Sequence, residues 1–395
     1  MTRRSVAVLG CTGSVGSQAL AILAAHPDRF RVVLLSAHSQ RNALAAAADI
    51  HRAPAACLTA ASDSTPASGP WPAGTRVYSG AAGLLEALQD TAPDLVLNAI
   101  TGAAGLAASE WTLRAGKTLA LANKESLVVA GEYLMPLAAR TGARILPVDS
   151  EHCALFQCLH GESPRAVRKL WLTGSGGPFR TRPLGTFAAI TVEEALRHPT
   201  WTMGPRITVG SATMMNKAFE VLEAHWLFGV PADTIEVVLH PQSIVHSMVE
   251  FVDGSILAQC GVPDMQVPIR YCLGWPERLP AAFQPFDPVR WRTLEFAPLE
   301  AARYPAVGLA YDCLAAGGDS GARLNAADEI ATAAFLAGEI PFPAITAISE
   351  QVLAARPARP IGSLADVLAA DAEARQHATT LVGSGTAAAR PARQP

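Results

Sequence analysis

The chain has 395 residues, which is too long for one average domain and predicts two or three. Half of the residues are hydrophobic, which excludes a disordered chain, and the net charge of -3 argues against nucleic acid or an anionic membrane as a partner. Seven cysteines without a C-x-x-C pair indicate reduced thiols in a cytoplasmic protein, and exclude a disulfide framework or a zinc site.

The first 150 residues alternate short β-branched runs with Ala- and Leu-rich runs, which predicts an α/β fold with a doubly wound, Rossmann-like parallel sheet. The basic N-terminus leads into an apolar run too short for a signal peptide, so we interpret that run as the first strand. No run approaches the ~18 apolar residues of a membrane span. Strands are expected at 6–9, 31–35, 95–97, 118–122 and 144–148, helices at 14–25, 106–115 and 126–139, and a surface loop at 63–75.

The remainder of the chain predicts a second sheet followed by helices. Strand-like runs at 235–239 and 255–259 belong to a central α+β region, and residues 280–303, rich in Pro, Arg and Trp, are typical of a linker. The Ala-rich region 304–375 predicts helices, with breaks at 317–318 and 341–343 and fraying beyond about residue 380.

A glycine-rich turn, with Gly10, Gly13 and Gly16, joins the first strand to the first helix. Glycine lets the backbone turn tightly and approach a pyrophosphate, whose charge lies at the helix N-terminus. Such turns also join strands to helices for structural reasons alone, but the position at a strand–helix junction favours dinucleotide binding.

The end of the second strand distinguishes between two dinucleotides. Proteins that bind NAD usually carry Asp or Glu there, whereas this chain has no acid between positions 36 and 41. Ser39 and Arg41, helped by His38, suit a 2′-phosphate. The sequence therefore favours NADPH.

Asn123, Lys124 and Glu125 stand where the strand expected at 118–122 meets a helix, a place where open α/β sheets bind ligands. We expect Asn123 and Glu125 at the nicotinamide ribose and Lys124 at the substrate. The alternative is that Glu125 or Ser126 only caps the next helix.

Asp149, Ser150 and Glu151 follow the strand expected at 144–148. In an extended chain residues two apart point the same way, so Asp149 and Glu151 are expected to converge. Two adjacent carboxylates call for a divalent cation, and oxygen ligands suit Mg²⁺ or Mn²⁺. Taken alone, such a triplet is more often a solvated turn.

A third polar block has helical character from Ser211 onward. Asn216 and Glu220 are four residues apart and share one face beside Lys217. That face offers an amide, a carboxylate and an ammonium, which suffice to complete a metal site and to hold a phosphate.

Two further segments are candidates for contacts with a phosphate. The glycine-rich loop 173–178 contains Ser175 and can turn backbone N–H groups and a hydroxyl toward an anion. His198 and His246 are candidate acid/base or phosphate contacts. Because a lone histidine is more often structural, we favour His198, which stands beside Trp201.

Eight motifs occur in one order over nearly the whole chain: GCTGSVG, LANKESLV, LPVDSEHCALFQCL, LTGSGGPF, HPTWTMG, SATMMNK with its following Glu, HPQSIVHSMVEF.DGS and LNAADEI.TAAFL. With them the chain closely resembles the 1-deoxy-D-xylulose 5-phosphate reductoisomerase family, which catalyses the first committed step of the non-mevalonate isoprenoid route. The resemblance implies an NADPH-binding domain at 1–150, a central catalytic and dimerisation domain at 151–280, a linker at 281–303, a helical domain at 304–375 and a frayed tail at 376–395.

The resemblance also implies the residues of the site. A divalent cation, Mg²⁺ or Mn²⁺ with Co²⁺ as a third candidate, would be held by Asp149, Glu151 and Glu220. The substrate would contact Lys124, Ser150, Glu151, Ser175, His198, Ser211, Asn216, Lys217 and Glu220. NADPH would lie on Thr12, Gly13, Ser14, Val15, His38, Ser39, Gln40, Asn123, Glu125 and Gly204. Residues 198–206 would form a lid that closes with Trp201 and Met203.

The implied reaction is a rearrangement followed by a reduction. Chelation of two neighbouring sugar oxygens polarises the ketone, retro-aldol cleavage and re-addition give a branched aldehyde, and reduction by NADPH gives 2-C-methyl-D-erythritol 4-phosphate. Binding of the remote phosphate would help to close the lid and exclude water. The implied partners are a small phosphorylated sugar and a second copy of the chain, in the cytoplasm and away from membranes and nucleic acids.

Two positions depart from the family pattern. His38 and Ser39 replace a Gly and a basic residue. This change predicts either a weaker affinity for the 2′-phosphate or a contact of Arg41 with that phosphate in place of the missing basic residue. Gly210 replaces an Asp directly before Ser211, which predicts the loss of a supporting hydrogen bond or a helix cap without loss of the metal ligands.

These departures leave two alternatives open. One is a low-activity paralogue that binds ligand and has a regulatory role. The other is an acyl-phosphate reductase of the semialdehyde-dehydrogenase type, which needs a nucleophilic cysteine such as Cys153.

Overall fold

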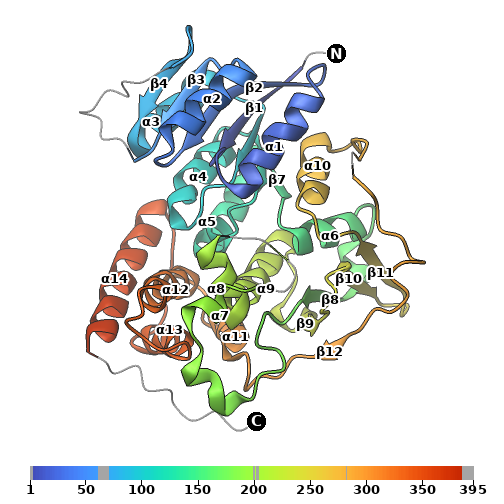
Figure 1. Ribbon diagram of the computed structural model, residues 1–395, viewed down its shortest axis with the longest axis vertical. Coiled ribbons are helices and arrows are strands. Elements are labelled where there is room, and N and C mark those ends of the chain that lie inside the picture. The colour runs from blue at the N-terminus through green and yellow to red at the C-terminus, as the bar shows by residue number, and fades with distance from the viewer. Residues whose placement is uncertain (1–2, 61–70, 199–200, 202–203, 282, 385–395) are drawn as a thin grey trace. The chain divides into compact units, whose positions relative to one another are not determined.

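The computed structural model describes residues 3–60, 71–198, 201, 204–281 and 283–384. The chain forms two compact units, each assembled from separate stretches of sequence (Figure 1). Unit 1 comprises Met1–Ser126, Leu134–Cys153 and Asp264–Ala282, and unit 2 comprises Leu127–Tyr133, Ala154–Pro263 and Phe283–Pro395. Helix α5, Glu125–Thr141, contributes residues to both units.

Unit 1 is built around a parallel sheet of seven strands in the order β4-β3-β2-β1-β5-β6-β7. The strand order reverses at β1, and open α/β sheets bind ligands beyond the carboxyl ends of the strands at such a point. The strands are β1 Arg4–Leu9, β2 Phe30–Ala37, β3 Ala55–Leu58, β4 Arg76–Ser79, β5 Leu95–Asn98, β6 Thr118–Leu121 and β7 Arg144–Pro147. The helices are α1 Ser14–Ala25, α2 Arg41–His51, α3 Gly80–Thr91, the 3-10 turn η1 Ala103–Gly105, α4 Leu106–Arg114 and α10 Gln266–Gly274.

The strands and helices expected in this region are present, with ends that differ by no more than two residues. Strands β1 and β5 are buried along almost their whole length, as parallel strands covered on both faces must be. Strands β3 and β4 and helices α2 and α3 were not expected. In β3 the run Ala-Ala-Cys-Leu lacks the β-branched residues that mark a strand. The surface loop expected at 63–75 lies largely outside the described residues.

Unit 2 contains a five-stranded sheet in the order β11-β10-β8-β9-β12. Strands β8 and β9 are parallel, and the remaining pairs are antiparallel. The strands are β8 Val167–Gly174, β9 Ile235–Leu239, β10 Val245–Phe251, β11 Ile256–Cys260 and β12 Ala297–Pro298. The two strands expected here, at 235–239 and 255–259, correspond to β9 and β11, and the short β12 lies within the expected linker.

Helices make up the rest of unit 2. They are α6 Ser150–Cys158 (which begins in unit 1), α7 Val192–Ala195, α8 Pro205–Thr213, α9 Met215–Phe228, α11 Pro305–Ala316, α12 Ser320–Leu336, α13 Ala344–Ala354 and α14 Leu364–Gly383, with the 3-10 turns η2 Pro164–Ala166, η3 Leu184–Ala189 and η4 Ala232–Thr234. A shared apolar core joins α12, α13 and α14 to Val209 and Ala212 of α8.

Helix α14 runs to Gly383, so the expected start of a frayed tail at 376 is wrong. Residues 385–395 lie outside the described part.

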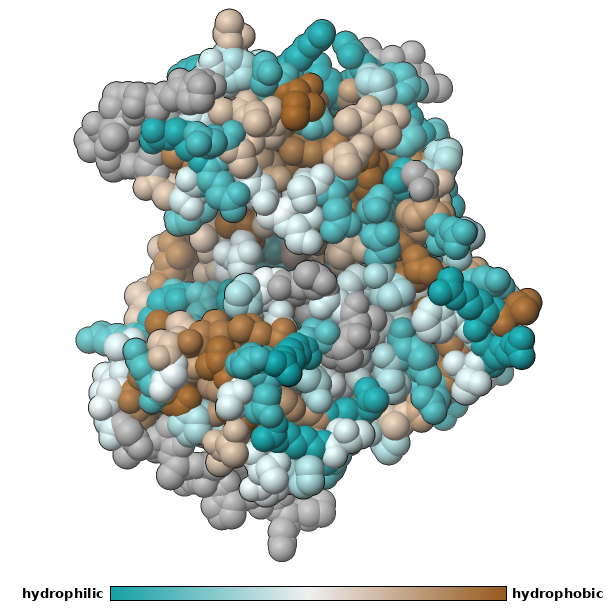
Figure 2. All heavy atoms as spheres, in the orientation of Figure 1, coloured by the Kyte–Doolittle hydropathy of each residue, from teal (hydrophilic) through white to brown (hydrophobic). Residues whose placement is uncertain are grey.

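Figure 2 shows hydrophilic side chains interspersed among hydrophobic ones over the visible face. Among the described residues, none of the helices combines the length and the apolar character that a membrane span requires.

Candidate active site

The turn after β1 has the close contacts that a dinucleotide turn requires. Gly10 has a φ of +74°, and a Cβ there would lie 2.6 Å from the carbonyl oxygen of Ala99. A Cβ on Gly16 would lie 2.3 Å from the carbonyl oxygen of Gly10, so only glycine lets α1 pack this closely against the turn. The N-cap residue, Gly13, makes no side-chain capping bond, which leaves the N-terminus of α1 suited to an anion. Thr12, Gly13, Ser14 and Val15 are exposed or half-buried.

His38, Ser39 and Gln40 form an exposed connection between β2 and α2. The Nδ1 atom of His38 lies 3.2 Å from the hydroxyl of Thr59. Gln40 is the N-cap residue of α2 and Arg41 is the first residue of that helix, so the connection ends at a helix N-terminus that favours negative charge. The expected contact of these residues with a 2′-phosphate stays a prediction.

Asn123 and Glu125 belong to a buried hydrogen-bond network. Asn123 Nδ2 donates to the carbonyl oxygens of Ile100 at 2.7 Å and Gly102 at 2.8 Å, and Glu125 Oε1 accepts from the backbone N–H of Gly102 at 3.0 Å. Neither Glu125 nor Ser126 is the helix cap that the alternative required, since the N-cap residue of α5 is Lys124 and it makes no side-chain capping bond. The network ties the loop after β5 to the loop after β6, and the contact with the nicotinamide ribose stays a prediction.

Asp149 lies directly after β7 among cationic and polar partners. Its Oδ2 atom lies 2.5 Å from the ammonium of Lys124 and 3.4 Å from Nδ1 of His152. Burial alone would raise the pKa of Asp149, but Lys124 and His152 lower that pKa well below its usual range. The Asp149 carboxylate is therefore ionised and paired with the ammonium of Lys124.

The extended conformation expected for Asp149, Ser150 and Glu151 is wrong. Helix α6 begins at Ser150, so Ser150 and Glu151 lie in its first turn. Asp149 Oδ1 accepts from the backbone N–H of Ser150 at 3.1 Å, and the Ser150 hydroxyl donates to Glu151 Oε2 at 2.7 Å. An acid or serine just before an apolar run is a helix start signal, and that signal outweighs strand alternation here.

In unit 2 the glycine-rich loop after β8 lies against helices α8 and α9. A Cβ on Gly177 would lie 2.8 Å from the carbonyl oxygen of Ser211, and one on Gly174 would lie 3.1 Å from Cε of Lys217. The Ser175 hydroxyl accepts from the backbone N–H of Gly177 at 3.2 Å. The expected phosphate-binding residues therefore come from elements that are packed together.

The helix expected from Ser211 onward is two helices. Met214, with a φ of +60°, separates α8 from α9, so Ser211 belongs to the first helix and Asn216 to the second. The expected shared face of α9 is present, since Asn216 Nδ2 donates to Glu220 Oε1 at 2.6 Å and Lys217 is paired with Glu220 Oε2. Lys217 and Glu220 are both buried, so this ion pair is desolvated.

His198 connects the β8 loop to the expected lid. Its Nδ1 accepts from the backbone N–H of Trp201 at 2.9 Å, and its Nε2 lies 3.3 Å from the hydroxyl of Ser175. Burial lowers the pKa of His198, which favours the neutral ring that these contacts use. His246 is also buried, with its ring centroid 6.5 Å from that of Trp201. Met203 lies outside the described residues.

Gly210 lies inside α8, close to the start of α9. A Cβ on Gly210 would lie 3.7 Å from the backbone nitrogen of Asn216, and Met214, the N-cap residue of α9, makes no side-chain capping bond. There is thus room for an acidic side chain beside an N–H group in the first turn of α9, and the expected loss of a cap at Gly210 stays a prediction.

Supporting contacts around the site were missed from sequence. Tyr304 donates its hydroxyl to the carbonyl oxygen of Gly176 at 2.7 Å, and Asn98 Nδ2 donates to the carbonyl oxygen of Gly105 at 2.8 Å. His152 is fully buried against Asp149. Only His152 had a local signal, because it stands next to the acidic triplet.

Comparison with known proteins gives matches along the whole described fold. The family model of 1-deoxy-D-xylulose 5-phosphate reductoisomerase matches residues 6–131, and models of the C-terminal domains of the same enzyme match residues 145–228 and 260–377. A 1-deoxy-D-xylulose 5-phosphate reductoisomerase from Dechloromonas aromatica is 48% identical over 387 residues, which cover 96% of this chain and 97% of that protein. One from Geobacter metallireducens is 44% identical over 384 residues, covering 96% and 99%.

Solved structures give the same result. The reductoisomerase from Zymomonas mobilis in complex with NADPH superposes with a TM-score of 0.90 at 42% identity, over 97% of this chain and all of that chain. A DOX-P reductoisomerase in complex with NADPH, fosmidomycin and magnesium superposes with a TM-score of 0.90 at 37% identity, over 97% and 99%.

Proposed function

The chain belongs to the 1-deoxy-D-xylulose 5-phosphate reductoisomerase family, and on that premise we propose how its residues convert 1-deoxy-D-xylulose 5-phosphate to 2-C-methyl-D-erythritol 4-phosphate with NADPH and a divalent cation. The relatives named above are reductoisomerases, and none of these matches supports a ligand-binding paralogue. The observation that carries the proposal is the packing of the Gly174–Gly177 loop against Ser211 and Lys217.

The phosphate of the sugar binds in unit 2. Ser175, Ser211, Asn216 and Lys217 come from the β8 loop and helices α8 and α9, and they supply hydroxyl, amide and ammonium donors. Gly177 allows the loop to approach α8 closely enough for these donors to share one anion. His198 donates from Nε2 toward Ser175, so it fixes the loop serine and lies beside the same group.

The metal is held by Asp149, Glu151 and Glu220, whose carboxylate oxygens are the ligands that Mg²⁺ and Mn²⁺ prefer. The donor set fits a cation, because Asp149 and Glu220 are each paired with a lysine ammonium and so already hold positive charge. A bound divalent cation supplies a Lewis acid for the substrate carbonyl. Without the cation, Lys124 and Lys217 balance the negative charges of Asp149 and Glu220.

Ser150 and Lys124 contact the reacting part of the sugar. The Ser150 hydroxyl and the Lys124 ammonium lie beside Glu151 and Asp149, the two acids that follow β7. From there Lys124 can donate a proton to a substrate oxygen on which negative charge develops. Trp201, held by His198, covers the sugar and excludes water, with Gly204 as the hinge of the lid.

NADPH binds along the carboxyl edge of the parallel sheet and supplies the hydride. Its pyrophosphate lies on Thr12–Val15, the 2′-phosphate on His38, Ser39 and Gln40, and the nicotinamide ribose near Asn123, Glu125 and Gly204. The buried Asn123–Glu125 network shapes this last part by fixing the loop at 100–102. The preference of the protein for NADPH over NADH is tested by measuring the specificity constant for each cofactor. A ratio of the two constants near one would contradict the assignment of residues 38–40 to the 2′-phosphate.

The chain forms a homodimer through its central region. Strand β11 is an edge of the five-stranded sheet and exposes Ile256 and Leu257, with Val252 exposed just before it. An exposed apolar edge strand is a template for pairing with a second chain. We assign the domains as 1–150 for NADPH, 151–280 for catalysis and dimerisation, 281–303 as linker and the region from 304 to the end of α14 at Gly383 as the helical domain.

The protein works in the cytoplasm. All seven cysteines are free thiols, and six of them are buried. Retention of reduced thiols is typical of proteins in a reducing compartment.

The test of this function is a spectrophotometric assay of the purified protein with 1-deoxy-D-xylulose 5-phosphate, Mn²⁺ and NADPH. We expect loss of NADPH absorbance that depends on both the substrate and the cation. Cys153→Ser is the control for acyl-phosphate chemistry: Cys153 is buried in α6, so the variant should keep almost full activity. Absence of substrate-dependent NADPH consumption would overturn the proposal.

A further inference from the structure

The motif LNAADEI occupies residues 324–330 of α12 and contributes none of the proposed ligand contacts. Its polar residues instead bind Arg206, near the start of α8. Arg206 Nη1 lies 2.9 Å from Glu329 Oε1, and Nη2 donates to Asn325 Oδ1 at 3.0 Å. Asp328 adds a carboxylate oxygen 3.9 Å from Nη2. One guanidinium therefore connects α8 to one face of α12.

Arg206 lies at a place in α8 that is unfavourable for a positive charge. Arg206 follows Pro205 in the first turn of α8, where the partial positive charge of the helix N-terminus disfavours a cation. The first turn of α8 has no acidic residue of its own. The carboxylates of Asp328 and Glu329 therefore supply the negative charge that helix α8 lacks at this end.

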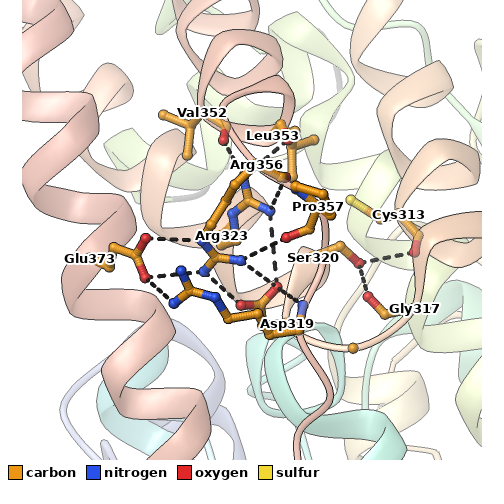
Figure 3. A network of polar contacts seen from close by, with 12 residues as sticks. Cys313, Gly317, Asp319, Ser320, Arg323, Val352, Leu353, Arg356, Pro357 and Glu373 are labelled. Atoms are coloured by element: carbon orange, nitrogen blue, oxygen red, sulfur yellow. Dashed lines mark hydrogen bonds and ion pairs between the residues drawn. The ribbon is translucent and has the colours of Figure 1, made fainter.

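Helix α12 is a firm support for this contact because its N-terminal end is fixed by a polar network (Figure 3). The buried Arg323 donates to the carbonyl oxygens of Val352 and Leu353 in the last turn of α13 and of Arg356 just beyond that helix. Asp319, just before α12, accepts from Arg356 Nη2 at 2.7 Å, and Glu373 of α14 accepts from Arg356 Nε at 2.9 Å. The network joins α12, α13 and α14, and Arg323 stands two residues before Asn325.

The same two helices also meet through apolar side chains. Val209 and Ala212 of α8 share a core with Ala326 and Ala327 of α12. Ala212 is adjacent to Ser211, so the polar contact at Arg206 and the apolar contact at Ala212 enclose the part of α8 that carries the proposed phosphate ligand.

We propose that Arg206 is a positioning residue that anchors α8 on α12 through Glu329 and Asn325, and so places Ser211 against the phosphate-binding loop. The inference rests on the proposed function through the role of Ser211. It gives the C-terminal helices a part in substrate affinity although they carry no ligand contact.

The anchor is tested first without activity, by hydrogen–deuterium exchange of the α8 amides. In Arg206→Ala and Glu329→Gln we expect exchange over residues 206–213 to rise about tenfold, the order expected from loss of a hydrogen bond to a charged group. The control is Glu373→Gln, which loosens the α13–α14 network but does not touch Arg206. Unchanged exchange in Arg206→Ala, or an equal rise in Glu373→Gln, would overturn the anchor.

Steady-state kinetics then test the consequence. Arg206→Ala should raise KM for 1-deoxy-D-xylulose 5-phosphate about tenfold, with KM for NADPH unchanged and Arg206→Lys restoring part of the loss. An unchanged substrate KM, or equal rises for both ligands, would refute the positioning role. If the wild-type protein consumes no NADPH, the proposed function fails, while the exchange experiment still decides whether the anchor exists.

Discussion

The two units each place a glycine-rich loop after a parallel strand, but the loops depend on different surroundings. The loop at 10–16 in unit 1 leads directly into α1, and its tight contacts are with its own neighbours along the chain and with Ala99, which directly follows the adjacent strand β5. The loop at 174–177 in unit 2 is completed by Ser211 and Lys217 from two other helices and by Tyr304 from more than a hundred residues away. A helix N-terminus binds a phosphate locally, whereas the second loop must have its donors brought to it.

The difference has a consequence for ligand binding. Changes in the first loop should affect the dinucleotide alone, and changes in the second loop or in the helices that complete it should affect the sugar alone. A substitution in either loop is therefore expected to weaken the binding of one ligand only, and equal loss of both ligands would show that the two loops do not act separately.

The largest separation is expected from Glu220→Gln. The change removes one charge from the proposed metal ligands and from the partner of Lys217, while it touches no proposed NADPH contact. We expect kcat to fall about 10²–10³-fold, the order of a few kcal/mol of lost Lewis-acid stabilisation, with the Kd of NADPH changed less than about threefold. Fluorescence titration with NADPH beside steady-state assays measures both, and parallel losses would contradict the assignment.

Gly16→Ala should have the converse effect on unit 1. The new methyl group would lie 2.3 Å from the carbonyl oxygen of Gly10, so α1 must move away from the turn. We expect NADPH affinity to fall about 100-fold and unfolding to become easier by about 1–3 kcal/mol, the usual cost of overpacking. Gly83→Ala is the matched control, since its Cβ would make an ordinary contact of 3.4 Å with Tyr78. Unaltered NADPH affinity in Gly16→Ala would show that the loop at 10–16 does not belong to the cofactor site.

Gly177→Ala tests the second loop. Gly177 has a φ of +63°, and its Cβ would lie 2.8 Å from the carbonyl oxygen of Ser211, so the loop must withdraw from α8. We expect KM for the sugar phosphate to rise about tenfold or more, as for a strained backbone costing ~1–3 kcal/mol, with NADPH affinity retained. Gly185→Ala, at an open position, is the control and should leave both constants unchanged. A selective loss of NADPH would reverse the assignment of the two loops.

The smallest effect is expected from Gly210→Asp. The carboxylate would lie beside the N–H of Asn216 in the first turn of α9, where the N-cap residue Met214 makes no side-chain capping bond, and a helix cap contributes about 0.5–2 kcal/mol. We expect Tm to rise by about 2 °C. Gly210→Ala separates the cap from helix propensity, because its methyl group fits but accepts no hydrogen bond. A lower Tm in Gly210→Asp than in Gly210→Ala would exclude the cap.

The comparison of the two loops also shows how far the sequence alone could lead. The turn at 10–16 and helix α1 were predicted to the residue, since the glycines, the strand before them and the helix after them are contiguous. The pairing of Asn216 with Glu220 was predicted for the same reason, as a property of one helix turn.

Contacts between distant segments could not be predicted in this way. Nothing in the sequence around Tyr304 indicates a hydrogen bond to Gly176, and Arg206 gives no sign of its partners on α12. Local signals also competed at Asp149, where the end of a strand suggested an extended chain but the helix start signal at Ser150 prevailed. Met214 divides the expected helix because it adopts a left-handed backbone conformation, which a methionine in this sequence context does not predict.

The most direct test of the proposed reaction is the ratio of branched product formed to NADPH oxidised. Purified protein is incubated with 1-deoxy-D-xylulose 5-phosphate, NADPH and Mn²⁺, with and without a chelator, and 2-C-methyl-D-erythritol 4-phosphate is quantified by mass spectrometry beside NADPH oxidation. We expect equal amounts of product and oxidised NADPH, and the loss of both when the cation is removed. Oxidation of NADPH without the branched product, or product formation without a cation, would contradict the proposed reaction.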